Sequence, residues 1–131
     1  MTNPTQRDST PSGALSVVVP MFNEADNVWP LIERLQQGLA SYPHPWELIL
    51  VDDGSRDSTA ERLTEVAAEL REHVRVLHLR RNFGQTAAMQ AGIDAACGEF
   101  IATLDGDLQN DPADIPAMVE ELRERGLDLL V

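Results

Sequence analysis

One segment of the chain, residues 100–109, reads FIATLDGDLQ and joins an apolar run to three oxygen-bearing side chains. The apolar part is typical of a buried β-strand, and Asp105, Asp107 and Gln109 follow at its carboxyl end. Mg²⁺ and Mn²⁺ prefer oxygen ligands and commonly share them with the phosphates of a substrate. The segment therefore predicts a divalent-cation site at a strand end. Two aspartates at this spacing are, however, also typical of a solvated acidic loop.

The rest of the chain alternates between apolar runs and amphipathic stretches. Strands are predicted at residues 15–20, 47–52, 74–79 and 100–104, and a fifth strand begins at residue 127 and is truncated at residue 131. Helices are predicted at about 27–39, 58–70, 85–96 and 112–125. This alternation predicts an α/β fold, a parallel sheet of order 3-2-1-4 with helices on both faces.

Polar residues follow three of the predicted strands. Asn23 and Glu24 come after the first, residues 52–55 after the second, and residues 105–109 after the fourth. In the order 3-2-1-4 these three strands are neighbours, and ligands of such sheets bind beyond the carboxyl ends of the strands. We therefore expect the three clusters to converge on one crevice. A turn with a helix cap is the alternative interpretation of each cluster taken alone.

The composition excludes several classes of function. The chain has 131 residues and a formal net charge of −12, and all ten of its basic residues are arginines. Without lysine, Schiff-base chemistry and a Walker-A phosphate site are excluded, and the acidic balance argues against a nucleic-acid partner. A chain this acidic requires a cation or well-placed arginines to handle a phosphorylated ligand. The single cysteine, Cys97, excludes an intrachain disulfide and is expected in the core.

The domain organisation is expected to be simple. Residues 1–13, rich in Thr, Ser, Pro and Asn, predict a disordered N-terminal arm. Residues 14–131 predict one α/β domain, incomplete at its C-terminus.

Four motifs together resemble the family 2 glycosyltransferases of GT-A fold. They are VPMFNE at 19–24, VDDGS at 51–55, RNFGQ at 81–85 and LDGDLQ at 104–109. RNFGQ and DLQNDP at 107–112 are similar to the polyprenyl-phosphate branch, which includes dolichol-phosphate mannose synthases, bactoprenol glucosyltransferases and undecaprenyl-phosphate aminoarabinose transferases. The chain departs from this branch at Gly106, where alanine is more frequent, and at Phe22, where tyrosine is more frequent.

The resemblance implies that residues 14–131 are the nucleotide-sugar-binding half of a GT-A glycosyltransferase domain, and it implies roles for particular residues. It implies nucleotide contacts for one set: Pro20, Phe22, Glu24, Asp52, Asp53, Arg81, Gly84 and Asp105. In this set Asp52 or Asp53 would hydrogen-bond the base or the ribose. Asp105, Asp107 and Gln109 would hold Mg²⁺ or Mn²⁺ on the diphosphate of the donor.

The resemblance also implies a reaction. A sugar would move, with inversion and with the help of a metal, from a UDP- or GDP-linked donor to a polyprenyl phosphate. The catalytic residues are expected after residue 131, so the chain alone is expected to be inactive. The full-length protein is expected at the cytoplasmic face of the membrane, and the edge of the fifth strand is expected to promote a homo-oligomer.

Other functions remain open from the sequence. One is a non-catalytic nucleotide-sugar-binding module, and another is a family 2 enzyme with a sugar or other hydroxyl as acceptor. A haloacid-dehalogenase-type phosphohydrolase also uses a strand-end pair of aspartates with Mg²⁺, and a receiver module pairs acidic residues with a lysine. The absence of lysine from the sequence disfavours both.

Overall fold

The computed structural model describes residues 13–106 and 114–125, except the side chains of residues 122, 123 and 125. In chain order the elements are β1 (Leu15–Met21), the short 3₁₀ helix η2 (Ala25–Asn27), α1 (Val28–Leu39), β2 (Trp46–Asp52), α2 (Thr59–Glu69), β3 (Val74–His78), α3 (Gln85–Ala95), β4 (Phe100–Thr103) and α4 (Ile115–Arg125). The predicted fifth strand and the predicted N-terminal arm, apart from Gly13, lie outside the described residues.

The four strands form a parallel sheet of order β3-β2-β1-β4. This order confirms the prediction from the alternation of strands and helices. β1 lies between β2 and β4, and its Val18 is in register with Ile49 on one side and Thr103 on the other. The carboxyl ends of β1, β2 and β4 therefore meet at one edge of the sheet.

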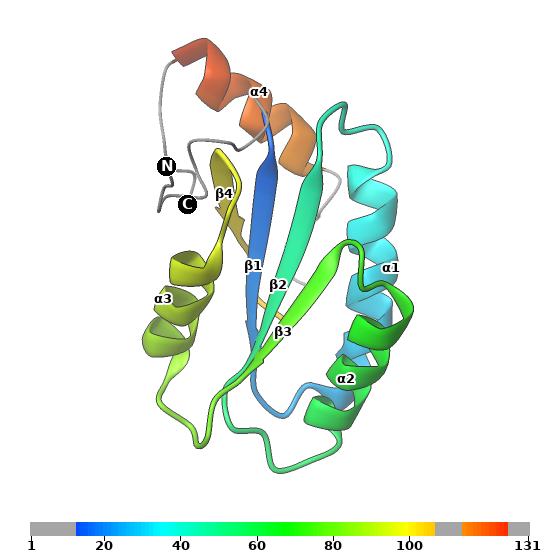
Figure 1. The fold of residues 1–131 in the computed structure, drawn as a ribbon, viewed down its shortest axis with the longest axis vertical. Coiled ribbons are helices and arrows are strands. Elements are labelled where there is room, and N and C mark those ends of the chain that lie inside the picture. Colours follow the sequence, from blue (N-terminus) through cyan, green and yellow to red (C-terminus); the bar gives the residue numbers. More distant parts are fainter. Residues whose placement is uncertain (1–12, 107–113, 126–131) are drawn as a thin grey trace, which may run out of the picture.

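The sheet is covered on both faces, as predicted (Figure 1). Alternate residues of β1, from Leu15 to Met21, belong to a large apolar cluster with α1, α2 and α4. Val18 belongs to a smaller cluster on the opposite face, with Ile49, Val51 and α3. Successive side chains of a strand point to opposite faces, so a strand that is buried on both faces contributes to two cores.

The small residues of α3 allow this helix to approach the sheet closely. A Cβ atom on Gly92 would lie 2.3 Å from Cγ1 of Val18, so a larger residue would push the helix outward. This contact therefore holds α3 against the sheet.

Two further points of the fold bear on the sequence predictions. Cys97 is exposed, which corrects the prediction of a core residue, because it lies in the turn between α3 and β4. Within the described residues, no helix has the length and apolar character that would let it cross a membrane.

Candidate functional site

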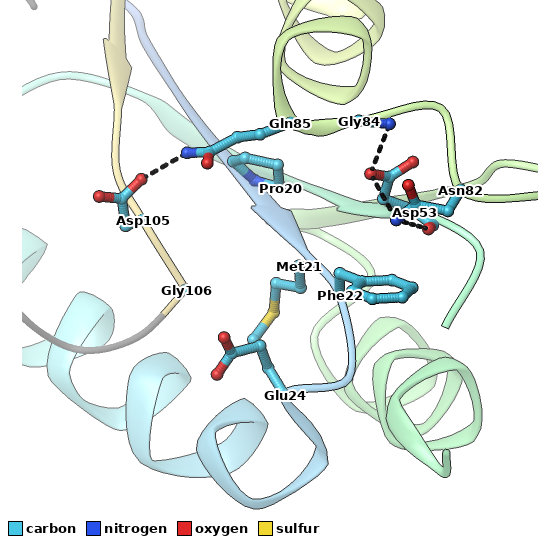
Figure 2. A pocket seen from close by; sticks show the side chains of 10 residues that line it. All are labelled: Pro20, Met21, Phe22, Glu24, Asp53, Asn82, Gly84, Gln85, Asp105 and Gly106. Atoms are coloured by element: carbon cyan, nitrogen blue, oxygen red, sulfur yellow. Dashed lines mark hydrogen bonds between the residues drawn. The ribbon is translucent and has the colours of Figure 1, made fainter. Parts of the chain in front are cut away.

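A pocket of about 480 Å³ lies at the carboxyl ends of β1, β2 and β4 (Figure 2). Ten residues line it: Pro20, Met21, Phe22, Glu24, Asp53, Asn82, Gly84, Gln85, Asp105 and Gly106. Six of the eight predicted nucleotide contacts are among them, whereas Asp52 and Arg81 are not. The predicted metal ligands Asp107 and Gln109 lie outside the described residues.

Asp53 fixes one wall of the pocket. The residue is only 2% exposed, and its backbone N–H donates to the carbonyl of Met21, which continues the pairing of β2 with β1. Its carboxylate accepts hydrogen bonds from the backbone N–H groups of Phe83 (2.8 Å) and Gly84 (3.1 Å) and from Nδ2 of Asn82 (3.2 Å). A buried carboxylate needs such partners, and these three come from the segment that leads into α3.

Gly54 lets this segment pass close to the end of β2. Its φ angle of +70° is a conformation that residues with a Cβ rarely adopt. A Cβ atom here would also lie 2.3 Å from the carbonyl carbon of Arg81 and 2.4 Å from the backbone nitrogen of Asn82. The glycine of the VDDGS motif is therefore required by backbone packing.

The hydrogen-bond partners of Asp52 differ from those of its neighbour Asp53. Its Oδ1 accepts a hydrogen bond from the backbone N–H of Ser55 (3.0 Å), and its Oδ2 lies 3.2 Å from Nδ1 of His78. The structure thus places Asp52, which is 4% exposed, in contacts that shape the loop after β2 and not in the pocket wall.

The loop after β1 is tied to the loop after β2. Asn23 has a φ angle of +53°, and its backbone N–H donates to Oγ of Ser55 while its Oδ1 accepts from the backbone N–H of Arg56. The backbone N–H of Glu24 donates to Oγ1 of Thr59. These bonds fix the backbone that follows the pocket-lining Phe22, which is 40% exposed.

The start of α2 is held by Asp57. Its carboxylate accepts hydrogen bonds from the backbone N–H and the hydroxyl of Thr59 and from the backbone N–H of Ala25. Partial desolvation alone would raise the pKa of Asp57, but these hydrogen bonds outweigh it and hold the pKa below its usual value. The carboxylate therefore links η2 to α2 in its charged form.

Asp105 faces the pocket from the end of β4. Its Oδ1 accepts a hydrogen bond of 2.8 Å from Nε2 of Gln85, the first residue of α3 (Figure 2). The next residue, Gly106, packs against β1, since a Cβ atom there would lie 3.1 Å from Cγ of Met21 and 3.3 Å from the carbonyl oxygen of Pro20. Gly106 and Met21 therefore fit each other in the lining of the pocket.

Arg81 lies next to the pocket without lining it. Its guanidinium carbon is 4.5 Å from the ring centroid of Phe83, a cation–π contact between two exposed side chains. The backbone of Arg81 thus packs against Gly54, and its side chain contacts Phe83.

Four lining residues were not among the predicted contacts: Met21, Asn82, Gln85 and Gly106. Asn82 and Gln85 stand within the RNFGQ motif, and Met21 and Gly106 stand next to predicted contacts in chain order. Membership in these motifs is the feature of the sequence that could have identified them as lining residues. Which side chains of a motif face the ligand depends on loop geometry, which the sequence does not specify.

The electrostatics of the pocket suit a cation. Three carboxylates line it, and their hydrogen-bond donors are neutral amide groups: Asn27 for Glu24, residues 82–84 for Asp53 and Gln85 for Asp105. None of the ten lining residues is an arginine. In the described ranges no group of three His, Cys, Asp or Glu is arranged as a metal site, and Asp105 is the described member of the predicted ligand set. An exposed carboxylate in an acidic pocket fits Mg²⁺ or Mn²⁺.

Comparison with known proteins finds relatives in the polyprenyl-phosphate branch, which the motifs of this chain resemble. Dodecaprenyl-phosphate galacturonate synthase of Rhizobium johnstonii is 59% identical over 124 residues, which cover 95% of this chain and 37% of that protein. Undecaprenyl-phosphate 4-deoxy-4-formamido-L-arabinose transferase of Pectobacterium atrosepticum is 47% identical over 106 residues, or 81% of this chain and 32% of that protein. The chain thus spans about a third of the length of these relatives, which confirm the resemblance to the polyprenyl-phosphate branch.

Solved structures confirm the GT-A fold. A mannosyltransferase from Pyrobaculum calidifontis in complex with GDP-Man and Mn²⁺ has a TM-score of 0.65 and 25% identity, covering 82% of this chain and 32% of that one. S. aureus TarS 1-349 in complex with UDP-GlcNAc has a TM-score of 0.67 and 24% identity, and the match covers 86% of this chain and 32% of that one. The sequence model of Glycosyl transferase family 2 matches residues 16–131, and the chain belongs to this family.

Proposed function

We propose that this chain is the donor-binding part of a glycosyltransferase that moves a sugar from a nucleoside diphosphate to a polyprenyl phosphate. The observation that carries the proposal is the pocket at the carboxyl edge of the sheet, which is lined by Phe22, Asp53 and Asp105. The 59% identity to a dodecaprenyl-phosphate galacturonate synthase supports the class of acceptor. Because that acceptor is a membrane lipid, we place the active protein at the cytoplasmic face of a membrane.

In the proposed complex the nucleoside lies between the loops after β1 and β2. The exposed ring of Phe22 offers an apolar surface to the base, and the carboxylates of Glu24 and Asp53 offer acceptors to N–H or hydroxyl groups. Asp53 already accepts three hydrogen bonds, so its remaining acceptor capacity is small. We therefore assign the larger share of ligand hydrogen bonding to Glu24.

The diphosphate lies toward Asp105 in this proposal. A phosphate group next to three carboxylates is repelled unless a cation stands between them. Mg²⁺ or Mn²⁺ would be held by Asp105 together with Asp107 and Gln109, and when bound it would stabilise the charge that develops on the departing nucleoside diphosphate. UDP and GDP donors are both compatible with this set of contacts.

The bond changes of the proposed reaction are simple. An oxyanion of the lipid phosphate attacks the anomeric carbon, the bond from that carbon to the diphosphate oxygen breaks, and the electron pair leaves with the nucleoside diphosphate. One displacement inverts the anomeric configuration. The acceptor is already charged near neutral pH, so a strong general base is unnecessary.

A chimera tests this function. The chain replaces the matching residues of the Rhizobium johnstonii synthase, and transfer from a nucleotide sugar to dodecaprenyl phosphate is followed by mass spectrometry, with the product anomer assigned by NMR. We expect an active chimera, an inverted product and a loss of activity of about 10²-fold or more in its Asp105→Asn variant. Retention of configuration, or full activity of the variant, would contradict the proposal.

A further inference from the structure

The segment of residues 82–85, here named the bridging segment, joins two strands that are not neighbours in the sheet. One end is bound to Asp53 after β2, through the backbone N–H groups of Phe83 and Gly84. The other end reaches Asp105 after β4, through the side-chain amide of Gln85. β1 lies between β2 and β4, so the bridging segment crosses the carboxyl end of β1 (Figure 2).

The path of the bridging segment is constrained along its length. The backbone of residues 81 and 82 packs so closely against Gly54 that there is no room for a Cβ atom. Gly84 has a φ angle of +102° and precedes the first turn of α3. The close contact of Gly92 with Val18 then fixes α3 on the sheet. Gln85 is therefore attached to a backbone that is held before and after it.

The side chain of Gln85 restricts the carboxylate of Asp105. Asp105 is exposed, and an exposed carboxylate without a partner samples several rotamers. The hydrogen bond to Oδ1 selects one of them and so fixes the direction of Oδ2. A side chain that orients a metal-binding carboxylate in this way influences the metal without touching it.

We propose that Gln85 is a positioning residue for Asp105 and that Asp53 is the anchor of this arrangement. Its consequence for ligand binding rests on the proposed function, in which Asp105 acts at the donor diphosphate. In this account Asp53 determines the orientation of Asp105 across β1, through the bridging segment. The two ends differ in kind, because Asp53 holds the backbone of the segment whereas Gln85 contributes its side chain.

NMR spectroscopy of this chain tests the coupling without any ligand. Asp53→Asn replaces one carboxylate oxygen by an NH₂ group, which then faces the N–H donor of residue 83 or that of residue 84. Asn82→Ala removes only the hydrogen bonds from Nδ2 of Asn82. In both variants we expect the side-chain NH₂ signals of Gln85 to move toward those of a free glutamine. In Gln85→Met we expect the signals of Asp105 to shift, with amide exchange of Phe83 and Gly84 unchanged within about twofold.

Gln90→Met is the matched control for this experiment. Gln90 lies on the same helix, and its Nε2 also donates a hydrogen bond of 2.8 Å to an aspartate, Asp94. We expect this variant to leave Asp105 unchanged. Should the Gln85 side-chain signals keep their wild-type positions in Asn82→Ala and in a folded Asp53→Asn, the coupling is wrong.

Calorimetric titration of UDP and GDP, with and without Mn²⁺, measures the consequence for binding. We expect Gln85→Met to weaken Mn²⁺-supported affinity by about 10- to 100-fold. Affinity without Mn²⁺ should stay the same, which a direct contact of Gln85 with the nucleotide would not allow. A wild-type chain indifferent to Mn²⁺ would contradict the proposed function, and the NMR result would still decide the coupling. Wild-type behaviour of Gln85→Met with Mn²⁺ would overturn the positioning role.

Discussion

At each end of the sheet, one carboxylate links a strand to a loop next to α3. The groups that donate hydrogen bonds to the two carboxylates are different. At the amino end, Glu47 accepts hydrogen bonds from Oγ of Ser16, the backbone N–H of Cys97 and the guanidinium of Arg75. At the carboxyl end, the donors to Asp53 are neutral amides. A guanidinium neutralises its partner, whereas amides leave the negative charge in place.

This difference distinguishes a structural network from the proposed binding site. The negative charge that remains at the carboxyl end faces a pocket, where it is joined by Glu24 and Asp105. At the amino end the charge is compensated within the chain by Arg75. A cation is therefore attracted to the carboxyl end, and changes at the two ends should separate stability from ligand binding.

The largest effect is expected at the carboxyl end, from Gly54→Ala. The new Cβ atom would meet the backbone of Arg81 and Asn82 and would sit at a positive φ angle, at a cost of about 3 kcal/mol in the free energy of unfolding. Gly84→Ala is the control, since its φ is also positive but no atom lies within 4 Å of the added Cβ. We expect it to cost about 1 to 2 kcal/mol. Equal losses in urea unfolding would show that packing at Gly54 is unimportant.

A smaller effect is expected at the amino end, from Glu47→Ala. The substitution removes the acceptor of the fully buried Ser16 hydroxyl and should cost about 2 kcal/mol in the free energy of unfolding. The exposed ion pair with Arg75 adds little to this loss. Nucleotide affinity, measured on the folded variant, should not change. A loss of affinity would contradict the separation of the two ends.

The smallest effect is expected from Asp57→Asn, at the start of α2. The pKa of Asp57 is lowered in the folded protein, so its carboxylate stabilises the fold above the pKa of the unfolded chain, about 3.9. This contribution is lost as the pH falls through the lower, folded-state value. Because Asp57 is exposed and solvent screens its interactions, we expect the variant to be less stable by only about 0.5 kcal/mol at pH 7 and by a vanishing amount near pH 2. A difference that is constant with pH in urea unfolding would contradict this.

The sequence predicted the fold more completely than it predicted the site. Apolar strands alternating with amphipathic helices allow few parallel arrangements, so the order β3-β2-β1-β4 followed from patterns along the chain. Asp52 and Asp53 are adjacent in the same motif, and only the pleat and the loop geometry decide which of them faces the pocket. Cys97 was correctly placed between the predicted helix and strand but wrongly expected in the core, because the direction of a side chain in such a turn depends on the tertiary structure.

Gln85 shows a second limit of the sequence. Its importance in the structure depends on Asp105, twenty residues later in the chain, and on the path of the bridging segment over β1. Contacts of this kind follow from the tertiary arrangement of two connections, and no local pattern in the sequence contains them.

The central claim is that the carboxyl end of the sheet binds a nucleoside diphosphate with the help of a divalent cation. Calorimetric titration of UDP and GDP into the chain tests it most directly, with and without Mn²⁺, beside Asp105→Asn and the control Asp94→Asn. We predict Mn²⁺-dependent binding of one nucleotide, weakened about 10-fold or more in Asp105→Asn and unchanged in Asp94→Asn. Binding that is indifferent to Mn²⁺ and to the loss of the Asp105 carboxylate would contradict the claim.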